Sequence, residues 1–153
     1  MKAHHARPGF TLIEVLIVVT ILAILAGVAI TQFGSSVEDA KQSALLIDLN
    51  KMRTLIEVYK MDHLAMPPDP SNALGQMVAA TNAQGQIGPP GPDFPYGPYI
   101  VGTIPPNPFT LSRNITLYTG TGTPSASGAS DAGWIYNPTT GSIWCDDPTF
   151  IAY

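Results

Sequence analysis

The chain has 153 residues, of which 45% are hydrophobic and only 12% are charged, and its formal net charge at pH 7 is −4. This length suits one small domain with an appendage and excludes two independent hydrophobic cores. Because Lys and Arg are scarce, the composition argues against a nucleic-acid partner, which needs a clustered cationic face.

Residues 10–30 form an apolar run, FTLIEVLIVVTILAILAGVAI, that contains one charged residue, Glu14. As a helix this run would be about 31 Å long, which is enough to cross a bilayer. Lys2 and Arg7 precede it, as in a secretory signal peptide, but such peptides have a shorter apolar run, of about 7 to 15 residues, without acids. Because a carboxylate near the centre of a membrane helix costs about 2.5 to 3.5 kcal/mol, Glu14 is predicted to have a functional partner.

An amphipathic helix is predicted to continue from this run to near Leu64, since no proline occurs between Pro8 and Pro67. The residues around Gly34 are expected to loosen it. Alternating spacings of four and three place five apolar residues on one face: Leu45, Leu49, Met52, Ile56 and Tyr59. We expect this stripe to pack on the core rather than form a coiled coil, because it spans fewer than three heptads.

The remainder of the chain is predicted to be loop-rich with short strands, because eleven of the fifteen prolines lie between Pro67 and Pro108. Trp134–Asn137 and Ser142–Cys145 flank a turn and are predicted to form a β-hairpin. Tyr99–Thr103 and Ile115–Thr119 are further strand candidates. Between them and the hairpin, residues 119–132 consist mainly of Gly, Ser, Thr and Ala, which is typical of a mobile loop.

The predicted fold class is therefore α+β: a long N-terminal helix, transmembrane and then amphipathic, packed on a small antiparallel sheet.

Few residues suggest chemistry. Cys145 is the only cysteine, so an internal disulfide and a four-thiolate zinc site are excluded, and we expect it to be a packed small residue. His63 is predicted to interact with the last carbonyls of the helix, whereas His4 and His5 lie before the apolar run. Because no nucleophile, base and orienting acid occur together, an enzyme is not expected. Trp134 and Trp144 are predicted to pack in the hairpin, with cargo binding by an exposed tryptophan as the alternative.

The N-terminus resembles a known family. A short basic stretch ending in Gly9, followed by FTLIEV with an acid as the fifth residue, resembles the prepilin signature of type IV pilins and type II secretion pseudopilins. The segments FGSSVEDAKQSALLIDLNKMRTLIEVYK, GPYIVGTIPPNPFT and GWIYNPTTGSI are similar to pseudopilins of the major, G-type class. The resemblance implies a pilin-like fold with a leader peptide over 1–9, a transmembrane and assembly helix over 10–35, its amphipathic continuation over 36–64 and a loop-rich β domain over 65–153.

The resemblance also implies processing and assembly. Prepilin peptidase would cut between Gly9 and Phe10 and methylate the new N-terminus at Phe10, and Glu14 would pair with the α-amine of a neighbouring subunit. The implied partners are further copies in a homo-oligomeric filament, other pseudopilins, the inner-membrane secretion platform and the membrane, without nucleic acid. The implied location is the bacterial inner membrane, crossed once, with the C-terminal domain in the periplasm.

The sequence departs from the family pattern in its cysteines and acids. Many type IV pilins close a C-terminal loop with a disulfide, which Cys145 alone cannot form, so a pseudopilin is favoured over a surface pilus for adhesion, motility or DNA uptake. Major pseudopilins often bind calcium in an acidic C-terminal loop, but only Asp131, Asp146 and Asp147 are available here. We therefore expect no metal or other cofactor, with these three aspartates as the ligands if calcium does bind.

Overall fold

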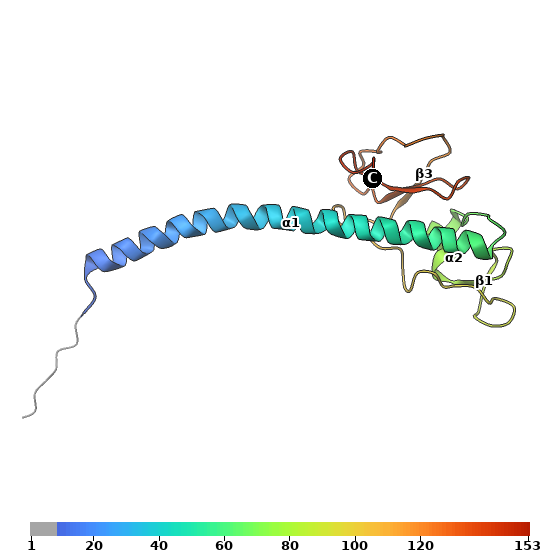
Figure 1. The fold of residues 1–153 in the computed structure, drawn as a ribbon, viewed down its shortest axis with the longest axis horizontal. Coiled ribbons are helices and arrows are strands. Elements are labelled where there is room, and N and C mark those ends of the chain that lie inside the picture. The colour runs from blue at the N-terminus through green and yellow to red at the C-terminus, as the bar shows by residue number, and fades with distance from the viewer. Residues whose placement is uncertain (1–8) are drawn as a thin grey trace, which may run out of the picture. The chain divides into compact units, whose positions relative to one another are not determined.

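The computed structural model describes residues 9–153, except for the side chains of residues 30–35 and 72–73. It contains two helices and five short strands, which confirms the predicted α+β class (Figure 1). By its internal contacts the chain divides into two compact units, Met1–Ala40 and Lys41–Tyr153. In chain order the elements are α1 Leu12–Asp62, α2 Ser71–Val78, β1 Ala80–Thr81, β2 Ile87–Gly88, β3 Ile115–Leu117, β4 Trp134–Tyr136 and β5 Ile143–Cys145.

The helix α1 has a continuous helical backbone, with no interruption at Gly34, where the sequence suggested loosening. It ends at Asp62, two residues before the predicted end near Leu64. Leu64 and Ala65 adopt positive φ values of 56° and 62°, and the Ala65 N–H donates to the Lys60 carbonyl at 2.8 Å. This left-handed turn satisfies a carbonyl of the last helical turn before the first proline of the loop region.

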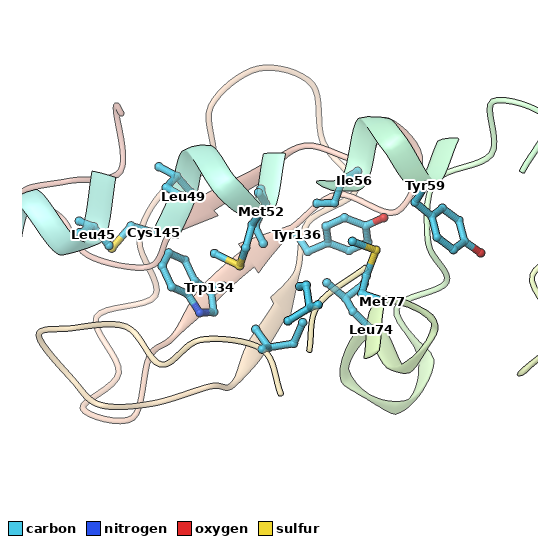
Figure 2. Packing of buried hydrophobic residues seen from close by; sticks show 13 residues of the cluster. Leu45, Leu49, Met52, Ile56, Tyr59, Leu74, Met77, Trp134, Tyr136 and Cys145 are labelled. Carbon is cyan, nitrogen blue, oxygen red and sulfur yellow. The ribbon is translucent and has the colours of Figure 1, made fainter. Parts of the chain in front are cut away.

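The predicted apolar stripe of α1 is the centre of the hydrophobic core (Figure 2). All five of its residues are at most 2% exposed. They pack with Leu74 and Met77 of α2 and with Trp134, Tyr136, Ile143 and Cys145 of the two hairpin strands. Burying one such side chain stabilises a fold by about 1.5 to 3 kcal/mol, so this cluster holds the sheet and α2 against the second half of α1.

The proline-rich region contains a helix that the sequence reasoning missed. Residues 67–108 were predicted to be loop with extended pieces, but α2 forms between Pro70 and Ala79 and buries Leu74 and Met77. The prediction of a strand over Tyr99–Thr103 is wrong. The backbone bends there without pairing to a strand, and the N–H groups of Tyr99 and Ile100 both donate to the Met77 carbonyl. These hydrogen bonds hold the stretch against the end of α2, and the side chain of Ile100 packs in the core.

The predicted hairpin is confirmed, since β4 and β5 pair antiparallel with Trp134 opposite Cys145. The strand predicted over Ile115–Thr119 is also present, as β3, but it pairs parallel to β4. The sheet is therefore mixed, with the order β3-β4-β5, and not wholly antiparallel as predicted. The connection between β3 and β4 is long enough to return to the starting end of the sheet, which permits a parallel pair.

Candidate functional site

The junction between Gly9 and Phe10 lies in non-helical chain just before α1. Phe10 is 87% exposed, and a Cβ added at Gly9 would meet no atom within 4 Å. Nothing in the described part of this chain therefore requires a glycine at position 9. If a glycine is required there, the requirement comes from a protein that binds the junction. The leader residues Lys2, His4, His5 and Arg7 lie outside the described residues.

Glu14, the acid in the apolar run, is bound within its own helix. Its Oε2 accepts hydrogen bonds from the Thr11 backbone N–H and from the Thr11 hydroxyl, both at 2.9 Å. In return the Glu14 N–H donates to Thr11 Oγ1 at 3.3 Å. This reciprocal arrangement is a capping box, which satisfies free N–H groups at a helix start.

The capping box was missed by the sequence reasoning, although its signal was present. The spacing is Thr-x-x-Glu at the start of an apolar run, which is the pattern of such a cap. Glu14 therefore has a hydrogen-bonding partner in its own chain, Thr11. Its contact with the α-amine of a neighbouring subunit stays a prediction.

The segment Leu12–Ala29 of α1 exposes its apolar side chains on every face. The segment Leu12–Ala29 is long and apolar enough to cross a membrane, and none of it is buried. Large apolar residues such as Leu12, Ile24 and Val28 are more than 60% exposed. A helix that is apolar all round requires either lipid or other helices around it.

The three aspartates considered for calcium do not converge. Asp131 Oδ2 accepts from the Asn114 amide at 2.9 Å, and Asp147 Oδ1 accepts from a backbone N–H two residues further on. Asp146, although only 2% exposed, accepts from the Ser127 N–H at 2.6 Å and from the Ser127 hydroxyl at 2.7 Å. Across residues 9–153, no group of three or more His, Cys, Asp or Glu residues could hold a metal ion.

His63 and Cys145 are both buried in the second unit. The Tyr59 carbonyl lies 2.8 Å from His63 Nδ1 and can only accept, so Nδ1 carries a proton, while Nε2 bonds to the Thr81 hydroxyl. This confirms the predicted contact of His63 with a helix carbonyl. Burial raises the pKa of the Cys145 thiol to about 12, with the nearby charge of Asp147 as a second cause. Cys145 is a packed thiol, as predicted.

The N-terminal residues match a known protein family. Residues 5–30 match the family described as the prokaryotic N-terminal methylation motif. This match covers the Gly9–Phe10 junction, the capping box and the whole exposed apolar segment Leu12–Ala29.

Curated relatives resemble part of the chain. The type II secretion system core protein G of Pseudomonas aeruginosa is 39% identical over 61 residues, covering 40% of this chain and 43% of that protein. The protein of the same name from Vibrio cholerae is 30% identical over 84 residues, covering 55% and 58%. The type IV major fimbrial protein FimA of Dichelobacter nodosus is 43% identical over 56 residues, covering 37% and 36%.

The chain thus spans about half the length of the curated relatives it matches. No solved structure gave a significant match. The comparisons and the structure point to the same kind of protein. The comparisons find a methylation motif, and the structure has a long apolar helix followed by a small α+β unit. Over the part that these comparisons cover, the chain is similar to type II secretion pseudopilins and type IV pilins.

Proposed function

We propose that the chain is a structural subunit of a type II secretion pseudopilus, which assembles into a periplasmic helical filament that helps to export proteins. The observation that carries this proposal is the exposed apolar helix Leu12–Ala29, preceded by a methylation motif. Several relatives that match part of the chain are named core protein G of a type II secretion system. Packing of these helices against one another would bury their apolar surface and drive assembly.

In this proposal the chain is first processed. Prepilin peptidase removes residues 1–9 by cutting after Gly9 and methylates the α-amine of Phe10. The exposed junction ahead of the helix fits a segment that must enter a peptidase cleft in extended form. Residues 10–35 would then be the transmembrane and assembly helix, residues 36–64 its amphipathic continuation and residues 65–153 the C-terminal β domain.

Glu14 would bind the α-amine of a neighbouring subunit during assembly. Its Oε2 is held by Thr11, whereas Oε1 makes no hydrogen bond within the described chain. A carboxylate can accept about four hydrogen bonds. The capping box therefore fixes the direction of the carboxylate and leaves one oxygen for an incoming amine, so that each charge neutralises the other in lipid.

The partners and location follow from the same proposal. The subunit would cross the bacterial inner membrane once, with its C-terminal domain in the periplasm, and would contact further copies, other pseudopilins, the secretion platform and the peptidase. Its relatives are named as a core protein of a type II secretion system and as a major fimbrial protein. A surface type IV pilus is the alternative, which the 43% identity to FimA over 56 residues favours.

Deleting the gene in the bacterium that carries it separates these two functions. If the proposal is correct, exported proteins accumulate in the periplasm while surface fibres and motility persist, and the wild-type gene restores secretion. The Glu14→Ala variant should be processed but should not restore it. Loss of surface fibres with intact secretion would instead establish the pilus alternative.

A further inference from the structure

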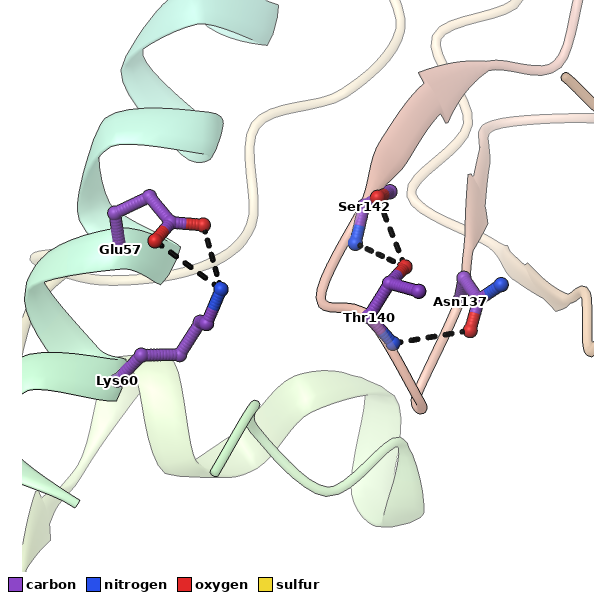
Figure 3. A network of polar contacts seen from close by, with 5 residues as sticks. All are labelled: Glu57, Lys60, Asn137, Thr140 and Ser142. Carbon is purple, nitrogen blue, oxygen red and sulfur yellow. Dashed lines mark hydrogen bonds and ion pairs between the residues drawn. The ribbon is translucent and has the colours of Figure 1, made fainter. Parts of the chain in front are cut away.

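A polar hollow of about 360 Å³ lies beside Trp144 in the C-terminal unit. One wall is residues 120–123 of the loop that follows β3. The other wall is the turn between β4 and β5, where Figure 3 labels Asn137, Thr140 and Ser142. Eight residues line it, and none is charged: Gly120, Thr121, Gly122, Thr123, Asn137, Thr140, Ser142 and Trp144. Its volume lies at the lower end of the range for small-ligand sites.

The aromatic wall of the hollow is fixed in place. Trp144 is partly exposed on β5, between the buried side chains of Ile143 and Cys145, so it faces away from the core. Tyr118 packs at right angles to its ring with centroids 6.0 Å apart, and the Tyr118 hydroxyl donates to the Thr121 carbonyl at 3.0 Å. Trp134, the other tryptophan, is buried and donates its indole N–H to the Pro105 carbonyl.

Hydrogen bonds between the lining residues also hold the polar wall in place. Asn137 is 2% exposed, and its amide Nδ2 donates to the Gly120 carbonyl at 3.1 Å, which ties the loop to the turn. The Thr140 hydroxyl donates to Ser142 Oγ at 2.8 Å (Figure 3). The hydroxyls of Thr121 and Thr123, in contrast, make no hydrogen bond within residues 9–153, and both side chains are exposed at the rim. They offer donors and acceptors to a ligand.

We propose that this hollow binds a neutral saccharide. A sugar ring presents an apolar C–H face that suits an indole and a rim of hydroxyls that suits threonine side chains. Because no Lys, Arg, Asp or Glu lines the hollow, an anionic or cationic ligand would lack a counter-charge. A second hollow of about 450 Å³ borders the same Ser142 and Trp144, so a linear oligosaccharide has room to continue past the first ring.

Calorimetric titration of the full chain tests this binding. The detergent must lack a sugar head group, since a maltoside would compete for the hollow; a polyoxyethylene detergent satisfies this. The probes are two β-1,4-linked tetrasaccharides, one of N-acetylglucosamine and one of glucose. We expect saturable binding with a Kd on the order of 1 mM, typical of a shallow site. If only the acetylated probe binds, the ligands are amino-sugar glycans, such as those of a cell wall. If both probes bind, the hollow is a general glycan site.

Variants locate the site. Trp144→Ala should weaken binding about tenfold by removing the stacking surface. The double variant Thr121→Val, Thr123→Val keeps the shape of both side chains in an exposed loop and should weaken binding without affecting the fold. Thr149→Val is the matched control, because Thr149 is exposed outside the hollow, and it should bind as the wild type does. The proposal is overturned if neither probe binds up to about 10 mM, or if both site variants bind like the wild type.

Discussion

Asp146 holds the loop between β3 and β4 against the sheet, and replacing it by Ala should destabilise the C-terminal unit. Its buried carboxylate accepts two short hydrogen bonds from Ser127 and a longer one, 3.4 Å, from the Thr116 hydroxyl. Hydrogen bonds to a charged group contribute about 1.5 to 3 kcal/mol each. Because Ser127 is exposed and its donors can return to water, we expect a net loss of about 2 to 3 kcal/mol, less than the sum of the separate contributions.

The assay is thermal unfolding of the full chain in detergent, followed by near-ultraviolet circular dichroism. For a unit of this size a loss of 1 kcal/mol lowers Tm by about 4 °C, so Asp146→Ala should lower it by about 8 to 12 °C. Asp147→Ala is the control, since Asp147 is partly exposed, and it should change Tm by about 2 °C at most.

A double-mutant cycle shows whether the stabilisation comes from the contact with Ser127. Asp146→Asn and Ser127→Ala each remove part of the contact, so the double variant should lose less than the sum of the single losses. Additive losses, or an Asp146→Ala protein as stable as the wild type, would refute the role given to this carboxylate.

Four further outcomes are expected. Gly9→Val should leave unprocessed precursor in the membrane, and mass spectrometry of the mature wild-type chain should show a start at Phe10 with one added methyl group. Glu14→Ala should be processed normally yet yield few filaments in electron micrographs, because an unpaired amine in lipid costs about 3 kcal/mol or more per contact. The Cys145 thiol should resist labelling at pH 8 until the protein unfolds. Its folded pKa, about 12, exceeds the unfolded value, so its contribution to stability is full below about pH 8.5 and declines as the pH rises toward 12. The Cys145→Ala variant should show a smaller decline. Millimolar calcium should leave Tm unchanged, whereas an increase of several degrees that a chelator reverses would show that the aspartates do bind it.

The parts of the fold that were predicted correctly have long or repeated sequence signals. The α1 stripe repeats over several turns, and the hairpin combines aromatic and β-branched runs with a turn containing Gly141, whose φ is 79°. The α2 helix was missed because it is short, begins after Pro70 without a side-chain cap and lies in a region dense in prolines. Burial of Leu74 and Met77 in the core, a tertiary effect, overrides the local preference.

The direction of β3 could not be read from local sequence either. Whether β3 runs parallel or antiparallel to β4 depends on the path of the residues between them, and these contain no regular element. That path is held by side chains distant in sequence, chiefly Asp146 to Ser127 and Asn137 to Gly120. Composition alone predicts a mobile loop here, because no local pattern records such contacts.

The two carboxylates that matter most in this chain are satisfied in the same way. Glu14 and Asp146 each accept a backbone N–H and a hydroxyl from one residue, Thr11 and Ser127 respectively. For Glu14 this alters the electrostatic argument for assembly. Its carboxylate already accepts hydrogen bonds from Thr11 within its own chain. In the proposed processing, the new α-amine would find no acceptor at its own helix start, because the free backbone groups there are also donors. In the proposed assembly, the pairing would therefore stabilise the amine of the incoming subunit more than it stabilises Glu14. The capping box would stabilise the acid in an apolar helix before that amine arrives.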